Sequence, residues 1–240
     1  MLYRLYLTPS LTEVCITVKK FLKGSHQLLL DNGFVASGGE SSFRIKQNDN
    51  QVHGVTILCN SKTLQIRIHF HYTFLQPMSR GASPSTPIMD MTSLDFPLWG
   101  EVARFERPLR KRCAWRKGFD DEWDGEFIVL KMRFALSLLQ DYSQKWANPE
   151  VLMDLLRPEA FIYKTYQPGA DTTPEEHSCV ASWLISPWLC NNDALLCSLA
   201  ASIAELHGYT DLVKEYQDVY RSEYCGESEL IRLRTDQKEQ

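Results

Sequence analysis

The segment from Leu64 to Phe74 alternates strictly between apolar and polar residues. Successive side chains of a β-strand point to opposite faces of the sheet, so a period of two over this length predicts a strand with one buried face. The apolar face carries Leu64, Ile66, Ile68, Phe70, Tyr72 and Phe74, and the polar face carries Gln65, Arg67, His69, His71 and Thr73. The segment therefore predicts a sheet with a core on one side and a candidate recognition surface on the other.

A helix is predicted before this strand. Ser10 to Glu13 has the form of a capping box, in which two side chains satisfy backbone N–H groups at the start of a helix. Asn32 and Gly33 predict the end of the helix, because glycine readily takes the left-handed conformation that closes one. Phe34 then begins extended chain.

Turn-rich stretches separate short apolar runs between this helix and Phe74. The turns are expected at 37–40, 48–50 and 60–62, and the strands at 42–47, 52–59 and 64–74. Strands joined by such short turns pair in an antiparallel meander. The predicted fold class is therefore α+β, with an N-terminal helix packed on an antiparallel β-meander.

The second half of the chain has helical patterns. Apolar residues recur at helical spacing from Phe127 to Trp146, and Asn148-Pro149 has the form of an N-cap followed by a first-turn proline. Thr173-Pro174-Glu175-Glu176 repeats the capping-box form. An antiparallel helix pair is expected at 193–207 and 211–224, with Gly208 and Thr210 as caps between the two. We expect three regions: an α+β domain at 1–126, a helical region packed on it at 127–225, and a polar tail at 226–240.

Charge is segregated between Arg104 and Glu126. A basic block at 104–117 precedes an acidic block at 120–126. Three interpretations are open: a hairpin that neutralises itself, a protein-binding surface, or a nucleic-acid site in which cations hold phosphates and Trp115 stacks on a base. The protein-binding interpretation makes the following residues candidates: Arg112, Trp115, Arg116, Asp120, Asp121, Glu122, Trp123 and Asp124.

Two histidines suggest a further alternative, a metal-dependent enzyme. His69 and His71 share a strand face, about 6.5–7 Å apart along the strand, and a transition metal can bridge that spacing. A third ligand is needed, for which His53 on the preceding strand is the obvious neighbour. Arg67 argues against a metal, because it places a fixed cation beside the site. We therefore include Arg67, His69 and His71 as candidates for binding a partner and expect no metal or other cofactor.

Composition favours an ordinary globular protein inside a cell. The chain has 240 residues with 44% apolar content and a formal net charge of −4, so no overall attraction to nucleic acid or anionic lipid is expected. Seven cysteines without a C-x-x-C pair fit free thiols in a reducing cytoplasm. We find no secretory signal, no membrane-spanning stretch and none of the common nucleophile, phosphate-loop or zinc-protease motifs. The long proline- and serine-containing stretch at 76–93 is expected to be a loop.

One further pattern combines three features: Asn32-Gly33-Phe34, the strands around Phe43, Leu58 and Ile68, and the segment 199–204 followed by Gly208. It resembles a family of small bacterial α+β proteins of unassigned function, in which a helix ending in Gly-Phe leads into a meander. Such domains often occur beside bacterial toxins and are taken to be immunity proteins. The resemblance implies a non-enzymatic cytoplasmic protein that binds a toxin and occludes its active site. It transfers no functional residue to this chain.

Overall fold

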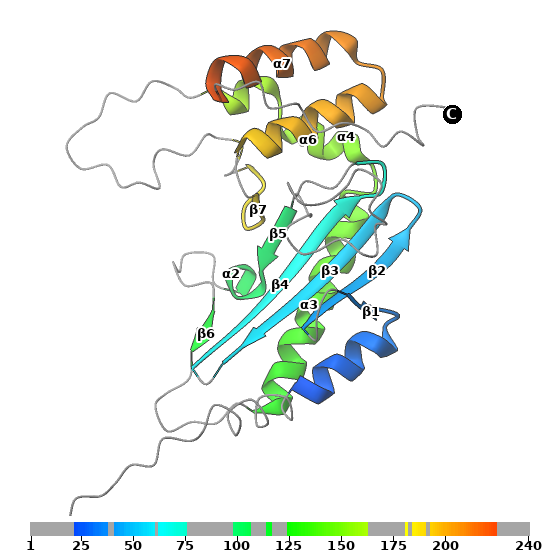
Figure 1. The fold of residues 1–240 in the computed structure, drawn as a ribbon, viewed down its shortest axis with the longest axis vertical. Coiled ribbons are helices and arrows are strands. Elements are labelled where there is room, and N and C mark those ends of the chain that lie inside the picture. Colours follow the sequence, from blue (N-terminus) through cyan, green and yellow to red (C-terminus); the bar gives the residue numbers. More distant parts are fainter. Residues whose placement is uncertain are drawn as a thin grey trace, which may run out of the picture.

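An antiparallel sheet with a long helix against one face forms the centre of the molecule (Figure 1). This computed structural model describes residues 22–37, 41–60, 62–75, 98–106, 114–116, 124–162, 181, 184–190 and 193–224. Within them the strand order is β1-β2-β3-β4-β5-β7, and β6 also pairs with β4. The bounds are β1 Val35–Ala36, β2 Ser42–Asn48, β3 Gln51–Cys59, β4 Thr63–Tyr72, β5 Leu98–Glu101, β6 Trp115–Arg116 and β7 Leu189–Cys190. The α+β class is confirmed.

The meander β2-β3-β4 agrees with the sequence pattern. Val55 of β3 lies opposite Phe43 of β2 and Ile68 of β4, so the apolar residues of three strands share one face. β4 ends at Tyr72, two residues before the predicted end, because Leu75 N–H donates to the Tyr72 carbonyl in a turn (3.1 Å). Phe74 is buried but does not belong to the strand. The predicted apolar face of β4 is otherwise confirmed.

The first described helix covers residues 22–31 and ends as predicted at Gly33. Gly33 has φ +81°, and two backbone bonds close the helix: Gly33 N–H to the Leu30 carbonyl (2.9 Å) and Phe34 N–H to the Leu29 carbonyl (3.0 Å). This bond pair is the Schellman motif, in which glycine takes the left-handed conformation. The capping box predicted at Ser10 lies outside the described residues.

Helical elements dominate the described part of the second half. They are α3 Gly125–Lys145, α4 Pro149–Leu155, the 3₁₀ turn η3 Pro158–Phe161, α6 Asp193–Leu206 and α7 Thr210–Tyr224, with the short strand β7 between η3 and α6. In addition, α2 Val102–Glu106 continues directly from β5. Helix α3 lies along the sheet, whereas α4, α6 and α7 gather at one end of it (Figure 1). The predicted helices at 127–146, 193–207 and 211–224 are confirmed. The capping box at 173–176 lies outside the described residues.

An aromatic cluster joins the sheet to α3. Phe70 of β4 makes edge contacts with Tyr72, Trp146 and Trp188, with ring centroids 5.1, 5.2 and 6.4 Å away. Tyr142 contacts Trp146 (4.9 Å) and Trp188 (5.0 Å). Aromatic rings bury large areas and prefer such edge-on geometry, so this cluster is a major part of the core.

The polar face of β4 is buried over its second half, which corrects the predicted recognition surface. His69 is 2% exposed and His71 is 0% exposed. His69 Nε2 lies 3.1 Å from Thr56 Oγ1, and His71 Nε2 lies 3.3 Å from the Leu75 carbonyl. Period two determines which residues share a face, but it does not determine whether the rest of the chain covers that face. His69 and His71 therefore do not form an accessible contact surface.

Candidate functional site: an acidic groove beside the α6–α7 turn

Arg67, like Gln65, is a partly exposed residue of the predicted polar row. Its Nε donates to Glu101 Oε1 (2.6 Å) across the β4-β5 pair, and its guanidinium lies 5.0 Å from the Trp99 ring centroid. The Arg67 side chain is 34% exposed and that of Glu101 is 2% exposed. Burial raises the pKa of Glu101, while the Arg67 hydrogen bond and charge act in the opposite direction. Arg67 thus has a structural partner within its own sheet.

The charged hairpin is described only in part. Trp115 is half-buried and its Nε1 donates to Glu106 Oε2 (3.1 Å), while Arg116 is exposed. Because Arg116 lies opposite Thr63, it shares the face of the sheet that carries Arg67. Asp124 caps α3 by accepting from Glu126 N–H (2.9 Å). The other predicted contact residues lie outside the described residues: Arg112, Asp120, Asp121, Glu122 and Trp123.

The histidine pair does not have the arrangement of a metal site. The Nε2 atoms of His69 and His71 contact different protein oxygens, as described above. Burial lowers the pKa of His69, with smaller contributions from the charges of Arg44 and Arg67. In the described part of the chain, no group of three or more His, Cys, Asp or Glu side chains could hold a metal ion.

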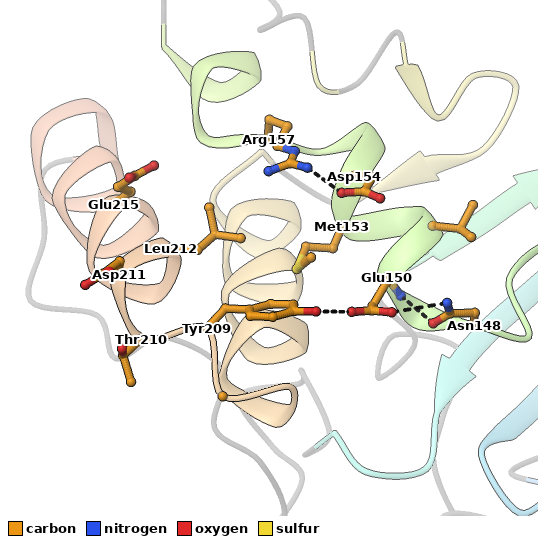
Figure 2. Close-up of a pocket in the computed structure, with 12 residues that line it drawn as sticks. Asn148, Glu150, Met153, Asp154, Arg157, Tyr209, Thr210, Asp211, Leu212 and Glu215 are labelled. Atoms are coloured by element: carbon orange, nitrogen blue, oxygen red, sulfur yellow. Dashed lines mark hydrogen bonds and ion pairs between the residues drawn. The ribbon is translucent and has the colours of Figure 1, made fainter.

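A groove of about 700 Å³ opens between α4 and the turn that joins α6 to α7 (Figure 2). Its walls carry four carboxylates, two on α4 and two on α7, and one guanidinium. The charged groups are Glu150, Asp154, Arg157, Asp211 and Glu215. Arg157 is already paired with Asp154 (2.6 Å), so the groove presents a net negative charge.

The α4 wall begins with a capped turn. Asn148 accepts from Glu150 N–H (3.0 Å), and Pro149 occupies the first helical position, as the Asn-Pro pattern predicts. Asn148 Nδ2 also donates to Glu150 Oε2 (3.3 Å). The cap therefore positions the backbone of α4 and the Glu150 carboxylate at the same time.

The opposite wall depends on a second Schellman motif. Gly208 has φ +74°, Gly208 N–H donates to the Glu205 carbonyl (3.1 Å), and Tyr209 N–H donates to the Ala204 carbonyl (3.0 Å). This motif closes α6 after Leu206 and turns the chain into α7. The predicted cap at Gly208 is confirmed.

Substituting Gly208 tests how far this turn depends on the left-handed conformation. No atom lies within 4 Å of where a Cβ would be, so the cost of alanine comes from the backbone alone. We predict that Gly208→Ala lowers the free energy of unfolding by about 1–2 kcal/mol, measured by urea titration. Gly208→Asn should lower the free energy of unfolding clearly less than Gly208→Ala does, because asparagine tolerates the left-handed conformation better than alanine. Equal losses would contradict the backbone explanation.

Tyr209 links the two walls. Its hydroxyl donates to Glu150 Oε1, and His207 Nδ1 lies 3.7 Å from the same oxygen. The hydrogen bonds from Tyr209 and Asn148 lower the pKa of Glu150, and the bond to Glu150 raises the pKa of Tyr209. Glu150 is therefore an ionised acceptor at neutral pH. Figure 2 shows Tyr209 reaching from the turn to Glu150 on α4.

Sequence reasoning did not find this groove. The sequence predicted caps at Asn148, Gly208 and Thr210 but assigned no function to the residues beside them. The structure confirms the first two, whereas Thr210 is the first residue of α7 and not its N-cap. Tyr209 and Glu150 are 59 positions apart, so their contact has no local sequence signal. The only usable signal was that acidic residues follow two of these predicted caps: Glu150 after Asn148, and Asp211 after Thr210.

Comparisons of the chain with protein-family models, with curated proteins and with solved structures found no match. None of the described helices is both long and apolar enough to cross a lipid bilayer. The functional interpretation therefore depends on the residues and geometry of this chain alone.

Proposed function

We propose that this chain is a non-enzymatic binding protein whose acidic groove receives a basic segment of a partner protein. The observation that carries the proposal is the charge of the groove, in which four carboxylates face one guanidinium that is already paired. A concave surface of one charge attracts an oppositely charged partner and disfavours a like-charged one. Lysine or arginine side chains suit this surface, and the phosphates of nucleic acid do not.

The groove also has features of protein contacts beyond its charge. Tyr209 is exposed, and Val151, Met153 and Leu212 add apolar lining. Tyrosine is enriched at interface hot spots because its ring supplies area and its hydroxyl supplies a hydrogen bond. Tyr209 is also held in place by Glu150, so little ordering is needed on binding.

The specific form that we propose is an immunity protein that neutralises a bacterial toxin. Many toxin enzymes act on nucleic acid or other anionic substrates and carry basic residues around their active sites. An acidic groove that encloses such basic residues would occlude the active site. This proposal keeps the function suggested by the sequence and moves the contact surface from the sheet face and the charged hairpin to the α4-α7 groove.

The proposal is tested with a toxin-domain protein encoded beside this gene. The two proteins are co-expressed, and survival of the host and co-purification are measured. We expect protection, and we expect affinity that falls as salt increases, since the attraction is between exposed charges. If the neighbour is toxic and this chain neither binds it nor protects the host, the immunity proposal is wrong.

Charge reversal in the groove tests the contact surface itself. We predict that Glu215→Lys weakens partner binding by about tenfold or more, because like charges then meet across the interface. Asp218→Lys is the matched control: it makes the same charge change on an exposed residue of α7 that does not line the groove. Calorimetry with each variant gives the two affinities. Equal losses would assign the effect to overall charge and not to the groove.

A further inference from the structure

A second cavity, of about 670 Å³, lies where the end of the first helix, strands β2 and β3 and the second half of α3 meet. It is separate from the acidic groove and shares no lining residue with it. Its lining combines apolar and amide side chains with one histidine and one arginine, and it includes no carboxylate. The residues that matter here are Asn32, Gln47, His53, Arg133 and Gln140.

His53 carries a buried polar atom for which the described residues provide no partner. It lies on the core face of β3, opposite Ile45 and Phe70, and is 1% exposed. Its ring contacts Phe70 (5.4 Å between centroids), but its Nε2 has no hydrogen-bond partner among the described residues. Buried polar atoms are nearly always paired, so this exception calls for a specific explanation.

Gln51 provides the comparison on the same strand and the same face. Its amide nitrogen donates to the carbonyls of Ser143 (3.2 Å) and Trp146 (2.9 Å), and its oxygen accepts from Ser143 Oγ (2.7 Å). The end of α3, together with Asn48 Nδ2 (3.2 Å), therefore satisfies the inward polar residue Gln51, whereas Nε2 of the next one, His53, has no partner among the described residues. Because His53 lines the cavity, a ligand that enters it lies beside this imidazole.

Arg133 indicates the charge of that ligand. It lies on the exposed side of α3, lines the cavity, and forms no ion pair with any described residue. A guanidinium binds a carboxylate through two parallel N–H groups. Burial lowers the pKa of His53 to about 4, so its imidazole is neutral at physiological pH and offers one donor and one acceptor. The cavity thus combines a cation at its surface with a neutral hydrogen-bonding group inside.

We propose that this cavity binds a small organic acid that carries further hydroxyl groups, with its carboxylate on Arg133 and a hydroxyl group on the His53 imidazole. The amides of Asn32, Gln47 and Gln140 provide additional donors and acceptors for such hydroxyls. The volume lies within the range of small-molecule sites. This inference is independent of the acidic groove and of the immunity proposal.

The test is an NMR titration of the imidazole resonances of His53 with three probes. Gluconate has both the carboxylate and the hydroxyls, glucose has only hydroxyls, and hexanoate has only the carboxylate. We expect gluconate to shift the His53 resonances with a Kd of about 1 mM or tighter, and the other two to bind about tenfold more weakly. No shift of His53 by gluconate, or equal binding of all three probes, would overturn the proposal.

Two variants separate the roles of the residues. Arg133→Gln changes an exposed residue and should weaken gluconate binding about tenfold by removing the charge-assisted bond. His53→Phe should also weaken it, yet leave the unfolding temperature of the free protein unchanged or higher, because it replaces an unsatisfied polar ring by an apolar one. Arg157→Gln, in the other groove, is the control and should leave the affinity unchanged. Unaltered binding in Arg133→Gln, or a lower unfolding temperature in His53→Phe, would contradict the proposal.

Discussion

Replacing Phe70 by alanine is expected to lower the free energy of unfolding by about 3–5 kcal/mol. Phe70 is fully buried at the centre of the cluster that joins β4, α3 and Trp188. Truncation removes its apolar area from the core and leaves a cavity between large rings that cannot collapse fully. Urea unfolding monitored by tryptophan fluorescence measures the change, since Trp146 and Trp188 border the cavity.

Leu130→Ala is the control for Phe70→Ala. Leu130 lies on α3 and is 60% exposed, so its truncation should change the free energy of unfolding by no more than about 0.5 kcal/mol. A loss below about 1 kcal/mol for Phe70→Ala would contradict the described contact between the sheet and α3.

Replacing Arg67 by methionine is expected to lower the free energy of unfolding by about 3 kcal/mol at neutral pH. This value is the lower end of the range for breaking a buried ion pair, because the Arg67 side chain is partly exposed. The loss comes from Glu101, whose buried carboxylate then has no counter-charge from Arg67. The double variant Arg67→Met/Glu101→Gln should recover most of the stability, since it removes the buried charge as well. Failure of the double variant to recover would assign the loss to packing of the arginine side chain.

The Arg67–Glu101 pair also predicts the direction in which the free energy of unfolding changes with pH. The pKa of Glu101 is raised in the folded protein, so the folded state binds its proton more readily than the unfolded state does. Its contribution to stability therefore falls as pH rises from the ordinary carboxyl pKa through the raised folded value. Arg67→Met removes the partner that lowers this pKa, so the fall should be larger and extend to higher pH. Unfolding free energies between about pH 5 and pH 8 test this. An identical pH dependence in wild type and variant would contradict it.

Local signals explain which features could be predicted. Gly33 and Gly208 end their helices as predicted. A single glycine is enough to specify such an end, because glycine readily takes the left-handed conformation that closes a helix. Asn148 caps α4 for a similar reason, since its side chain bonds to a backbone N–H two residues later. The buried face of β4 was also predictable, because period two is a property of a single strand.

The candidate sites needed information that no local pattern contains. His69 and His71 were expected on an accessible face, and the structure buries them. The Glu150–Tyr209 contact and the combination of His53 with Arg133 each bring together residues from distant segments. The charge pattern at 104–126, the strongest local signal for a partner surface, lies partly outside the described residues.

The sequence by itself determined the α+β class, the order of the meander strands, the two glycine helix ends and the apolar face of β4. These depend on backbone conformation and on alternation along one segment, which neighbouring residues specify. Only the tertiary structure decided which polar residues are buried and which line a groove. Burial depends on what covers a face, and a groove depends on where two helices end in space, and both are set by contacts between residues far apart in the chain.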